Sequence, residues 1–197
     1  MKNQRTIQAY ESYARTYAER TAGIPIGVPK EGLDILAGRV GRGGTIFEVG
    51  SGPGWEADYV ESLGVSVRRT DVTEAFIQVQ ASRGKRVERL DVAKDELGGP
   101  YAGVMAIAVL QHIERERLGE VLKRVAGSLT IGGTLLFSVP EGEETRQEGS
   151  AKDYYVAQWT AETLRAPIAS AGLLLDWIGR SEYDEGPWVT LLARRRM

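Results

Sequence analysis

Hydrophobic residues recur at helical spacing in the first part of the chain. Within residues 1–20, Ile7, Tyr10, Ala14 and Tyr17 follow one another three or four positions apart, which predicts an amphipathic helix. A segment rich in glycine and proline then interrupts the pattern, and a short helix is expected over residues 31–39.

From Thr45 onward, short apolar runs of strand length alternate with longer stretches of helical periodicity. The runs predict strands over residues 45–49, 65–70, 86–90, 101–108, 134–139, 173–179 and 188–194. The periodic stretches predict helices over residues 55–63, 73–82, 114–129 and 160–172. This order indicates an α/β fold with a doubly wound, mostly parallel, seven-stranded, Rossmann-like sheet and helices on both faces. Because residues 172–195 pass from strand to strand without a helix, we expect the last strand to be antiparallel.

The chain of 197 residues is long enough for one buried core, so we expect a single domain over residues 1–197. Residues 1–40 are expected to form an N-terminal helical lid, and residues 44–140 the cofactor-binding half. Residues 141–197 are expected to contribute a substrate-side loop, a helix and the closing strands.

Composition excludes several classes of site. The chain has no cysteine and a single histidine, which excludes disulfides, thiolate metal sites and zinc sites built on histidine pairs. We therefore expect no metal site. A net charge of −2 disfavours nucleic acid as a partner. The start carries no secretory signal, and the longest apolar run, residues 104–110, is too short to span a bilayer. The expectation is a cytoplasmic protein that does not contact membranes, either a monomer or a homodimer.

Three glycines occupy alternate positions directly after the first predicted strand. They are Gly50, Gly52 and Gly54 in the segment EVGSGPG, where a strand gives way to a helix. Glycine adopts positive φ freely and lets a ligand approach the backbone. The segment lacks the Gly-Lys-Ser/Thr ending of a phosphate-binding loop, and Trp55 replaces the third glycine of the dinucleotide pattern G-x-G-x-x-G.

Carboxylates accompany these glycines. Glu48 precedes the loop, and Asp71 and Asp91 follow the second and third predicted strands. At that edge of the sheet Asp71 can accept hydrogen bonds from ribose hydroxyls, and Asp91 from an adenine amine. We expect no lysine or arginine to face these carboxylates. The pattern therefore favours an adenosine that carries a positively charged tail over a pyrophosphate.

These segments, in this order, resemble the class I S-adenosylmethionine-dependent methyltransferases of the small-molecule type. EVGSGPG resembles their first motif, TDVTEAF and RLDVA their two acidic positions, AIAVLQHI the end of the fourth strand, and SLTIGGTLLFSV the entry to the fifth. The chain departs from the family at Tyr101-Ala102, where Phe-Asp is usual, and at Ile131, where proline is usual.

The resemblance implies S-adenosylmethionine as cofactor and S-adenosylhomocysteine as product. The cofactor-binding residues that it indicates are Tyr10, Tyr17, Glu48, Gly50, Ser51, Gly52, Gly54, Asp71, Val72, Asp91, Val92, Ala106 and Ile107.

His112 follows the fourth strand, where the family places the reactive end of the cofactor. It could act as a general base, or it could be held by a backbone carbonyl in a structural role, and both readings stay open. Tyr17 is the second candidate catalytic residue. The tyrosines of the first helix could form a lid or one buried face. The candidate substrate-binding residues are Tyr13, His112, Tyr154, Tyr155 and Trp159.

The sequence therefore predicts methyl transfer to an oxygen or nitrogen of a small molecule by in-line displacement. Two alternatives remain: an NAD(P)-dependent oxidoreductase on a Rossmann domain, and a non-catalytic partner protein that binds S-adenosylmethionine.

Overall fold

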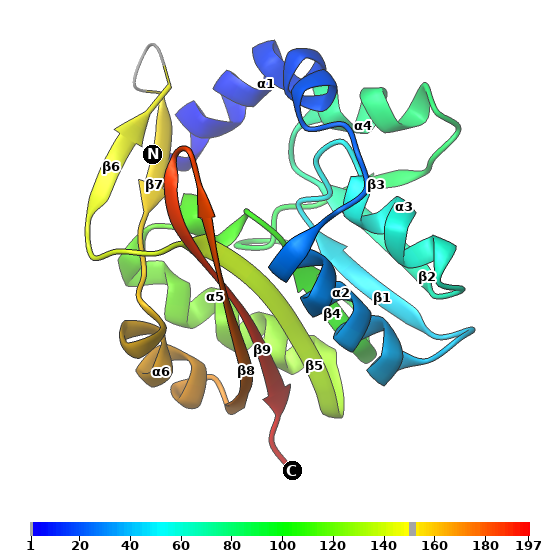
Figure 1. The fold of residues 1–197 in the computed structure, drawn as a ribbon, viewed down its shortest axis with the longest axis vertical. Coiled ribbons are helices and arrows are strands. Elements are labelled where there is room, and N and C mark those ends of the chain that lie inside the picture. The colour runs from blue at the N-terminus through cyan, green and yellow to red at the C-terminus, as the bar shows by residue number, and fades with distance from the viewer. Residues whose placement is uncertain (1, 150–152) are drawn as a thin grey trace.

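The short apolar runs of the sequence form one seven-stranded sheet (Figure 1). The structure is a computed structural model that describes residues 2–149 and 153–197. The strands are β1 Thr45–Val49, β2 Ser66–Asp71, β3 Val87–Arg89, β4 Tyr101–Ala106, β5 Leu129–Pro140, β8 Leu173–Tyr183 and β9 Gly186–Arg195. Their order is β3-β2-β1-β4-β5-β9-β8, and β9 runs antiparallel to both of its neighbours. The predicted fold class is confirmed, including the antiparallel last strand. The winding reverses between β1 and β4, so the carboxyl ends of these strands form the switch point where ligands bind in such sheets.

Helices cover both faces of the sheet because the strands carry apolar side chains on both. The helices are α1 Lys2–Arg20, α2 Gly27–Val40, α3 Trp55–Ser62, α4 Glu74–Ala81, α5 Arg115–Ser128 and α6 Ala161–Ser170, with a 3₁₀ turn η1 at Leu110–His112. Ile46 and Met105 face one side and join a buried cluster with α2 and α3. Their neighbours Phe47 and Val104 face the other side and join a cluster with α5 and α6. This alternation is the pattern of a sheet that is buried on both faces.

Several features differ from the sequence prediction: α2 begins at Gly27 rather than at residue 31, and β8 extends to Tyr183 rather than ending at residue 179. The segment after β5, expected to be a loop, contains two short antiparallel strands, β6 Thr145–Glu148 and β7 Tyr154–Ala157. Residues 150–152 of that segment lie outside the described residues. The fifth strand also begins at Leu129 rather than at residue 134. A shift in register against Tyr101 and Gly103 lets β5 continue through Gly132, which has a φ of +77°.

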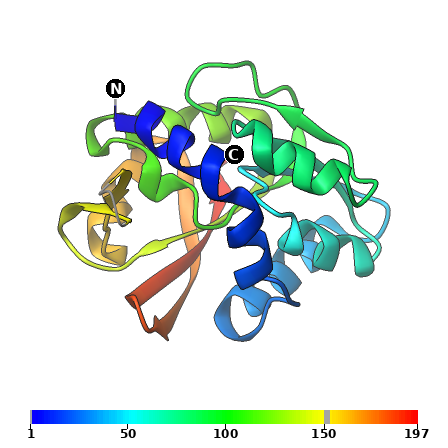
Figure 2. The same cartoon turned by 90° about the horizontal axis from the view of Figure 1, so that it is seen from above.

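Helix α1 lies outside the layers that pack on the sheet. Leu33 and Leu36 of α2 are fully buried in the core, so α2 is not part of a lid. Seen from above, α1 crosses the carboxyl ends of the strands between β7 and α4 (Figure 2). Thr6 Oγ1 accepts a hydrogen bond of 3.0 Å from the backbone N–H of Tyr155 at one end of this span. Glu11 accepts bonds of 2.7 and 2.8 Å from the N–H groups of Glu74 and Ala75, which begin α4. Helix α1 thus caps the N-terminus of α4.

Candidate active site

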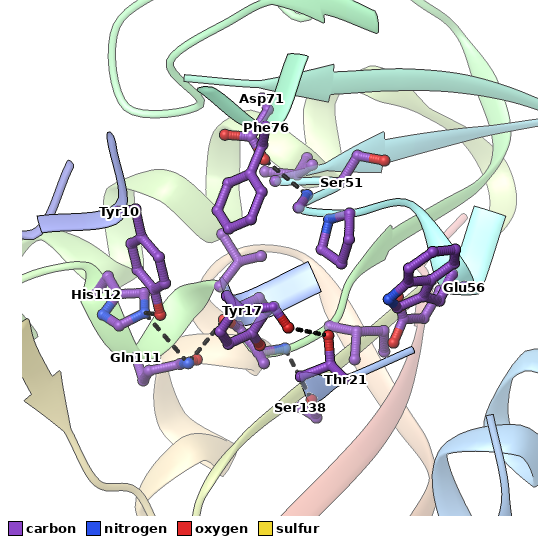
Figure 3. A pocket seen from close by; sticks show the side chains of 18 of the residues that line it. Tyr10, Tyr17, Thr21, Ser51, Glu56, Asp71, Phe76, Gln111, His112 and Ser138 are labelled. Atoms are coloured by element: carbon purple, nitrogen blue, oxygen red, sulfur yellow. Dashed lines mark hydrogen bonds between the residues drawn. The ribbon is translucent and has the colours of Figure 1, made fainter. Parts of the chain in front are cut away.

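A cavity of about 670 Å³ lies at the carboxyl ends of the strands, beside α1. Its wall combines the glycine loop, the ends of β2 and β4, the turn η1 and aromatic side chains from α1 and α4 (Figure 3). The cavity is large enough for a cofactor-sized ligand and is lined by both aromatic and polar groups, as small-molecule sites usually are.

The three glycines of the loop have different structural roles. All three have positive φ: +64° at Gly50, +51° at Gly52 and +85° at Gly54. A Cβ at Gly50 would lie 2.6 Å from the side chain of Val109, and one at Gly54 would lie 2.4 Å from Gln80. A Cβ at Gly52 would meet no described atom within 4 Å. Gly50 and Gly54 are therefore required by packing, and Gly52 is the position at which a ligand can approach the backbone.

Asp71 fixes the loop from the end of β2. Its two carboxylate oxygens accept hydrogen bonds from the N–H groups of Gly52 at 2.7 Å and Thr73 at 2.8 Å. Burial raises the pKa of this carboxyl, and hydrogen bonds from the backbone of Thr73, Gly52 and Val72 and from the Thr73 side chain oppose that rise. Each oxygen keeps a further lone pair, so Asp71, which lines the cavity, can still accept from a ligand hydroxyl.

Asp91 also lines the cavity. The expectation that no basic side chain faces the three carboxylates is wrong here, because Lys94 Nζ lies 2.7 Å from Asp91 Oδ2. The two residues stand three positions apart in the turn after β3, which brings their side chains together.

Glu48 lies behind the glycine loop and is not part of the cavity wall. Its side chain is 4% exposed and accepts a short hydrogen bond from Ser51 Oγ. Burial raises the pKa of this carboxyl to about 8. A buried acid with one donor in contact favours its protonated form.

The raised pKa of Glu48 makes stability depend on pH. Between its ordinary pKa of 4.5 and about 8, the folded protein holds a proton that the unfolded chain releases, so stability falls as pH rises through this window. A Glu48→Gln variant keeps an acceptor for Ser51 but cannot titrate at this position. Its stability should therefore fall less than that of the wild type as pH rises. Urea unfolding of both proteins at pH 5 and pH 8 measures the difference; equal pH slopes would show that Glu48 is not protonated in the fold.

His112 is held on both of its ring nitrogens. Nδ1 donates to the carbonyl of Tyr155 at 2.7 Å, because a carbonyl can only accept. Nε2 lies 3.2 Å from the hydroxyl of Tyr10 and 3.5 Å from the side-chain amide nitrogen of Gln111, and it accepts from these donors (Figure 3). Burial lowers the pKa of His112 and raises that of Tyr10, so both side chains are neutral at pH 7. Nε2 is the lone-pair nitrogen, and His112 and Tyr10 both line the cavity.

A strained residue shapes the wall beside His112. Ala108 has a φ of +54°, a conformation that costs a non-glycine residue free energy. Ser138 Oγ accepts from its N–H at 3.0 Å, and Gln111 Nε2 donates to its carbonyl at 2.7 Å. These two contacts hold the backbone after β4 in the shape that lines the cavity.

The cavity wall is predominantly acidic. Five carboxylates line it, from Glu56, Asp71, Asp91, Glu148 and Glu185. Among the described lining residues Arg146 carries the one positive charge, and its guanidinium is paired with Glu148. A cationic ligand therefore suits the wall better than a diphosphate does.

The structure brings most of the predicted site residues to this cavity. They are Tyr10, Tyr17, Gly50, Ser51, Gly52, Asp71, Val72, Asp91, Val92, Ile107, His112 and Tyr154. Glu48, Gly54 and Ala106 lie directly behind the wall. In residues 2–149 and 153–197, no cluster of His, Asp and Glu is arranged to hold a metal ion, and no helix combines the length and the apolar character needed to cross a bilayer.

Three predicted substrate-binding residues do not reach the cavity. The Tyr13 hydroxyl accepts a hydrogen bond from Arg20 at 2.7 Å, on the outer side of α1. Tyr155 and Trp159 are buried in the cluster beneath α5 and α6. Because side chains alternate along β7, Tyr154 faces the cavity and Tyr155 faces the core.

Sequence reasoning missed several residues that build the site, notably Phe76, Gln80, Gln111 and Glu148. Gln80 and Gln111 carry a signal that could have been used. Gln80 follows Phe76 by four positions and shares the buried face of α4. Gln111 interrupts an apolar run and is 5% exposed. A polar residue on an apolar face needs hydrogen-bond partners, and here these partners belong to the site.

Neither a protein-family model nor a curated protein sequence matches this chain. Solved structures resemble it closely in fold at low sequence identity. The Burkholderia thailandensis 1,6-didemethyltoxoflavin-N1-methyltransferase, with bound 1,6-didemethyltoxoflavin and S-adenosylhomocysteine, matches with a TM-score of 0.77 and 17% identity, over 98% of this chain and 88% of that one. The magnesium protoporphyrin IX methyltransferase of Synechocystis PCC 6803, with bound S-adenosylmethionine, matches with a TM-score of 0.75 and 15% identity, over 99% and 97% of the two chains.

The [4+2]-cyclase SpnF also matches, with a TM-score of 0.71 and 15% identity, over 96% of this chain and 94% of that chain. The same fold thus supports more than one reaction, and the reaction must be argued from the site. The sheet order, the glycine turn after β1 and these similarities together show that the chain has the fold of the class I S-adenosylmethionine-dependent methyltransferases.

Proposed function

We propose that this protein transfers a methyl group from S-adenosylmethionine to a nitrogen or oxygen of a small molecule. The observation that carries the proposal is the open backbone at Gly52, next to Asp71, in an acidic cavity at the switch point of this fold. Two relatives in fold, crystallised with S-adenosylmethionine or S-adenosylhomocysteine, support the choice of cofactor.

The described residues fit this cofactor. Asp71 has free lone pairs for the ribose hydroxyls, and Asp91 lies beyond it for the adenine amine. Phe76, Leu90 and Val92 supply apolar wall around that end of the cavity. The remaining carboxylates suit a sulfonium and an ammonium group. When bound, the cofactor supplies an electrophilic methyl group that a nucleophile can displace.

The protein's own contribution is to orient the acceptor, to exclude water and to accept a proton. Helix α1 lies over the cavity and brings Tyr10 and Tyr17 to its wall. Holding a nucleophile in line can lower the barrier by about 7–11 kcal/mol at best. The methyl acceptor first displaces the Tyr10 hydroxyl from Nε2 of His112. The neutral Nε2 then takes the proton from the hydroxyl or amine of the acceptor. The hydrogen bond from Nδ1 to the Tyr155 carbonyl keeps the imidazole ring in place.

The cavity also argues against the alternatives. A nicotinamide dinucleotide would bring two phosphates to the glycine turn and the start of α3, where Glu56 lines the cavity. A non-catalytic binding protein needs no proton acceptor, whereas His112, a neutral imidazole, lines this cavity. Enclosure beside α1 and the acidic wall favour a small acceptor over nucleic acid.

Thermal unfolding tests the proposed cofactor. S-adenosylhomocysteine should raise the melting temperature of the full chain in proportion to the logarithm of its concentration, because it binds the folded state only. NAD⁺ and NADP⁺ at the same concentrations should leave it unchanged. Stabilisation by a nicotinamide nucleotide but not by S-adenosylhomocysteine would overturn the proposal.

The role of His112 is tested by a His112→Gln variant. Glutamine can keep a bond to the Tyr155 carbonyl but cannot accept a proton, so turnover should fall by about 10²- to 10⁴-fold while S-adenosylhomocysteine binds as in the wild type. The measurement is transfer of tritiated methyl to acceptors chosen from a panel of small amines and hydroxyl compounds.

The pH profile provides the control for this prediction. The wild-type rate should fall as pH drops through a value below 6.5, because the imidazole of His112 then takes up a proton. The rate of the His112→Gln variant should not show this decrease. Equal turnover in the two proteins would leave His112 with a structural role.

A further inference from the structure

A buried glutamine holds the glycine loop from the side opposite the cavity. Gln80 of α4 is fully buried and donates hydrogen bonds of 2.9 Å to Ser51 Oγ and 2.9 Å to the carbonyl of Gly52. Its amide oxygen, Oε1, accepts a hydrogen bond from Arg69 Nη1 at 2.8 Å. Both N–H groups and the oxygen of the Gln80 amide are therefore engaged in hydrogen bonds.

The direction of the bonds that Gln80 makes is fixed by chemistry. A guanidinium can only donate, so Oε1 of Gln80 must face Arg69 and both N–H groups must face the loop. Ser51 accepts from Gln80 and donates in turn to Glu48. The result is one directed chain of hydrogen bonds from the Arg69 cation, through Gln80 and Ser51, to the Glu48 carboxyl.

Arg69 provides a rigid base for this chain. It is 3% exposed, and its Nη2 lies 2.7 Å from Asp58 and 2.8 Å from Glu61, both on α3. The third glycine belongs to the same arrangement. A Cβ at Gly54 would lie 2.4 Å from Gln80 Oε1 and 2.7 Å from Arg69 Nη1, so a side chain there would displace the pair.

Gln80 and Asp71 together fix both peptide groups that flank Gly52. Asp71 accepts from the N–H of Gly52, and Gln80 donates to its carbonyl. These two contacts set the backbone orientation of Gly52, which has a φ of +51° and lines the cavity. A buried helix residue thus determines the backbone shape that the ligand meets.

We propose that Gln80 is a positioning residue for cofactor binding: it holds the Ser51–Gly52 turn in the conformation that admits the cofactor. The inference rests on the proposed function, because it assigns the turn a ligand. Gln80 does not line the cavity and acts through Ser51 and Gly52.

A Gln80→Glu variant separates this role from simple packing. The carboxylate has nearly the same shape and keeps an acceptor for Arg69, but it has no N–H to donate to Ser51 or Gly52. The matched control is Gln78→Glu, which adds the same charge to an exposed position of the same helix. Calorimetry with S-adenosylhomocysteine and amide hydrogen exchange of the unliganded protein are the readouts.

We expect Gln80→Glu to remain folded but to unfold at a lower temperature than the wild type, because a carboxylate oxygen is buried against the Gly52 carbonyl. It should exchange the amides of residues 51–54 faster and raise the Kd for S-adenosylhomocysteine by about tenfold or more. Gln78→Glu should match the wild type in all three. A folded Gln80→Glu protein with wild-type loop exchange and wild-type Kd would overturn the inference.

Two further outcomes are covered. If Gln80→Glu does not fold, Gln80→Met removes the same donors without adding charge, and the same expectations apply to it. If the wild type fails to bind S-adenosylhomocysteine, the proposed cofactor is wrong, whereas loop exchange in the unliganded variants still shows whether Gln80 orders the turn.

Discussion

Deleting residues 1–21 is expected to leave the seven-stranded core folded and to weaken S-adenosylhomocysteine binding by about a hundredfold or more. Neither of the two large buried clusters of the described residues contains a residue of α1, and the buried apolar residues of this helix, Ala9, Ala14 and Ala18, are small, so most of the core lies outside it. The cavity does depend on it, because Tyr10 and Tyr17 supply part of its wall. Loss of two buried aromatic contacts, at about 1.5–3 kcal/mol each, accounts for the size of the effect.

Far-ultraviolet circular dichroism measures whether the truncated protein keeps its fold, and calorimetry measures its affinity. A matched pair of point variants refines the result. Glu11→Ala removes the cap that α1 places on α4, and Glu19→Ala changes an exposed glutamate on the same helix. Only the first should weaken binding. An unfolded truncated protein would make α1 part of the core, and unchanged affinity would exclude α1 from the site.

The hydrophobic pattern was sufficient to predict the sheet. The central strands β1, β4 and β5 carry apolar runs, and the core-facing helices repeat at three or four positions, because these faces are buried. The strands β2 (SVRRTD) and β3 (VER) are largely polar, and their place between predicted helices indicated them. The strands β6 and β7 escaped prediction because Thr145–Glu148 is polar throughout and pairs only with β7, away from the main sheet. Their pairing depends on tertiary context rather than on local pattern.

The site was predicted less completely than the fold. Spacing along the chain placed Gly52 and Asp71 at the edge of the sheet, because the carboxyl ends of parallel strands meet there. It could not show that Asp71 holds the loop, that Gly54 makes room for Gln80, or that Tyr155 turns away from the cavity. Those facts depend on contacts between residues far apart in the sequence.

The second large effect is expected at Gly52. A Gly52→Leu substitution places a side chain in the space that the proposed cofactor occupies, because a Cβ there meets no described atom within 4 Å and extends into the cavity. Leucine at positive φ also strains the backbone. Gly43→Leu controls for that strain, since Gly43 has a φ of +81° and equally open surroundings but does not line the cavity. Both variants should lose stability to a similar extent.

Calorimetric titration of the wild type, Gly52→Leu and Gly43→Leu with S-adenosylhomocysteine tests the central claim most directly. We predict one binding site per chain in the wild type and in Gly43→Leu, with similar affinity, and a Kd raised by more than about a hundredfold in Gly52→Leu. Absence of binding by the wild type, or wild-type affinity in a folded Gly52→Leu protein, would contradict the account.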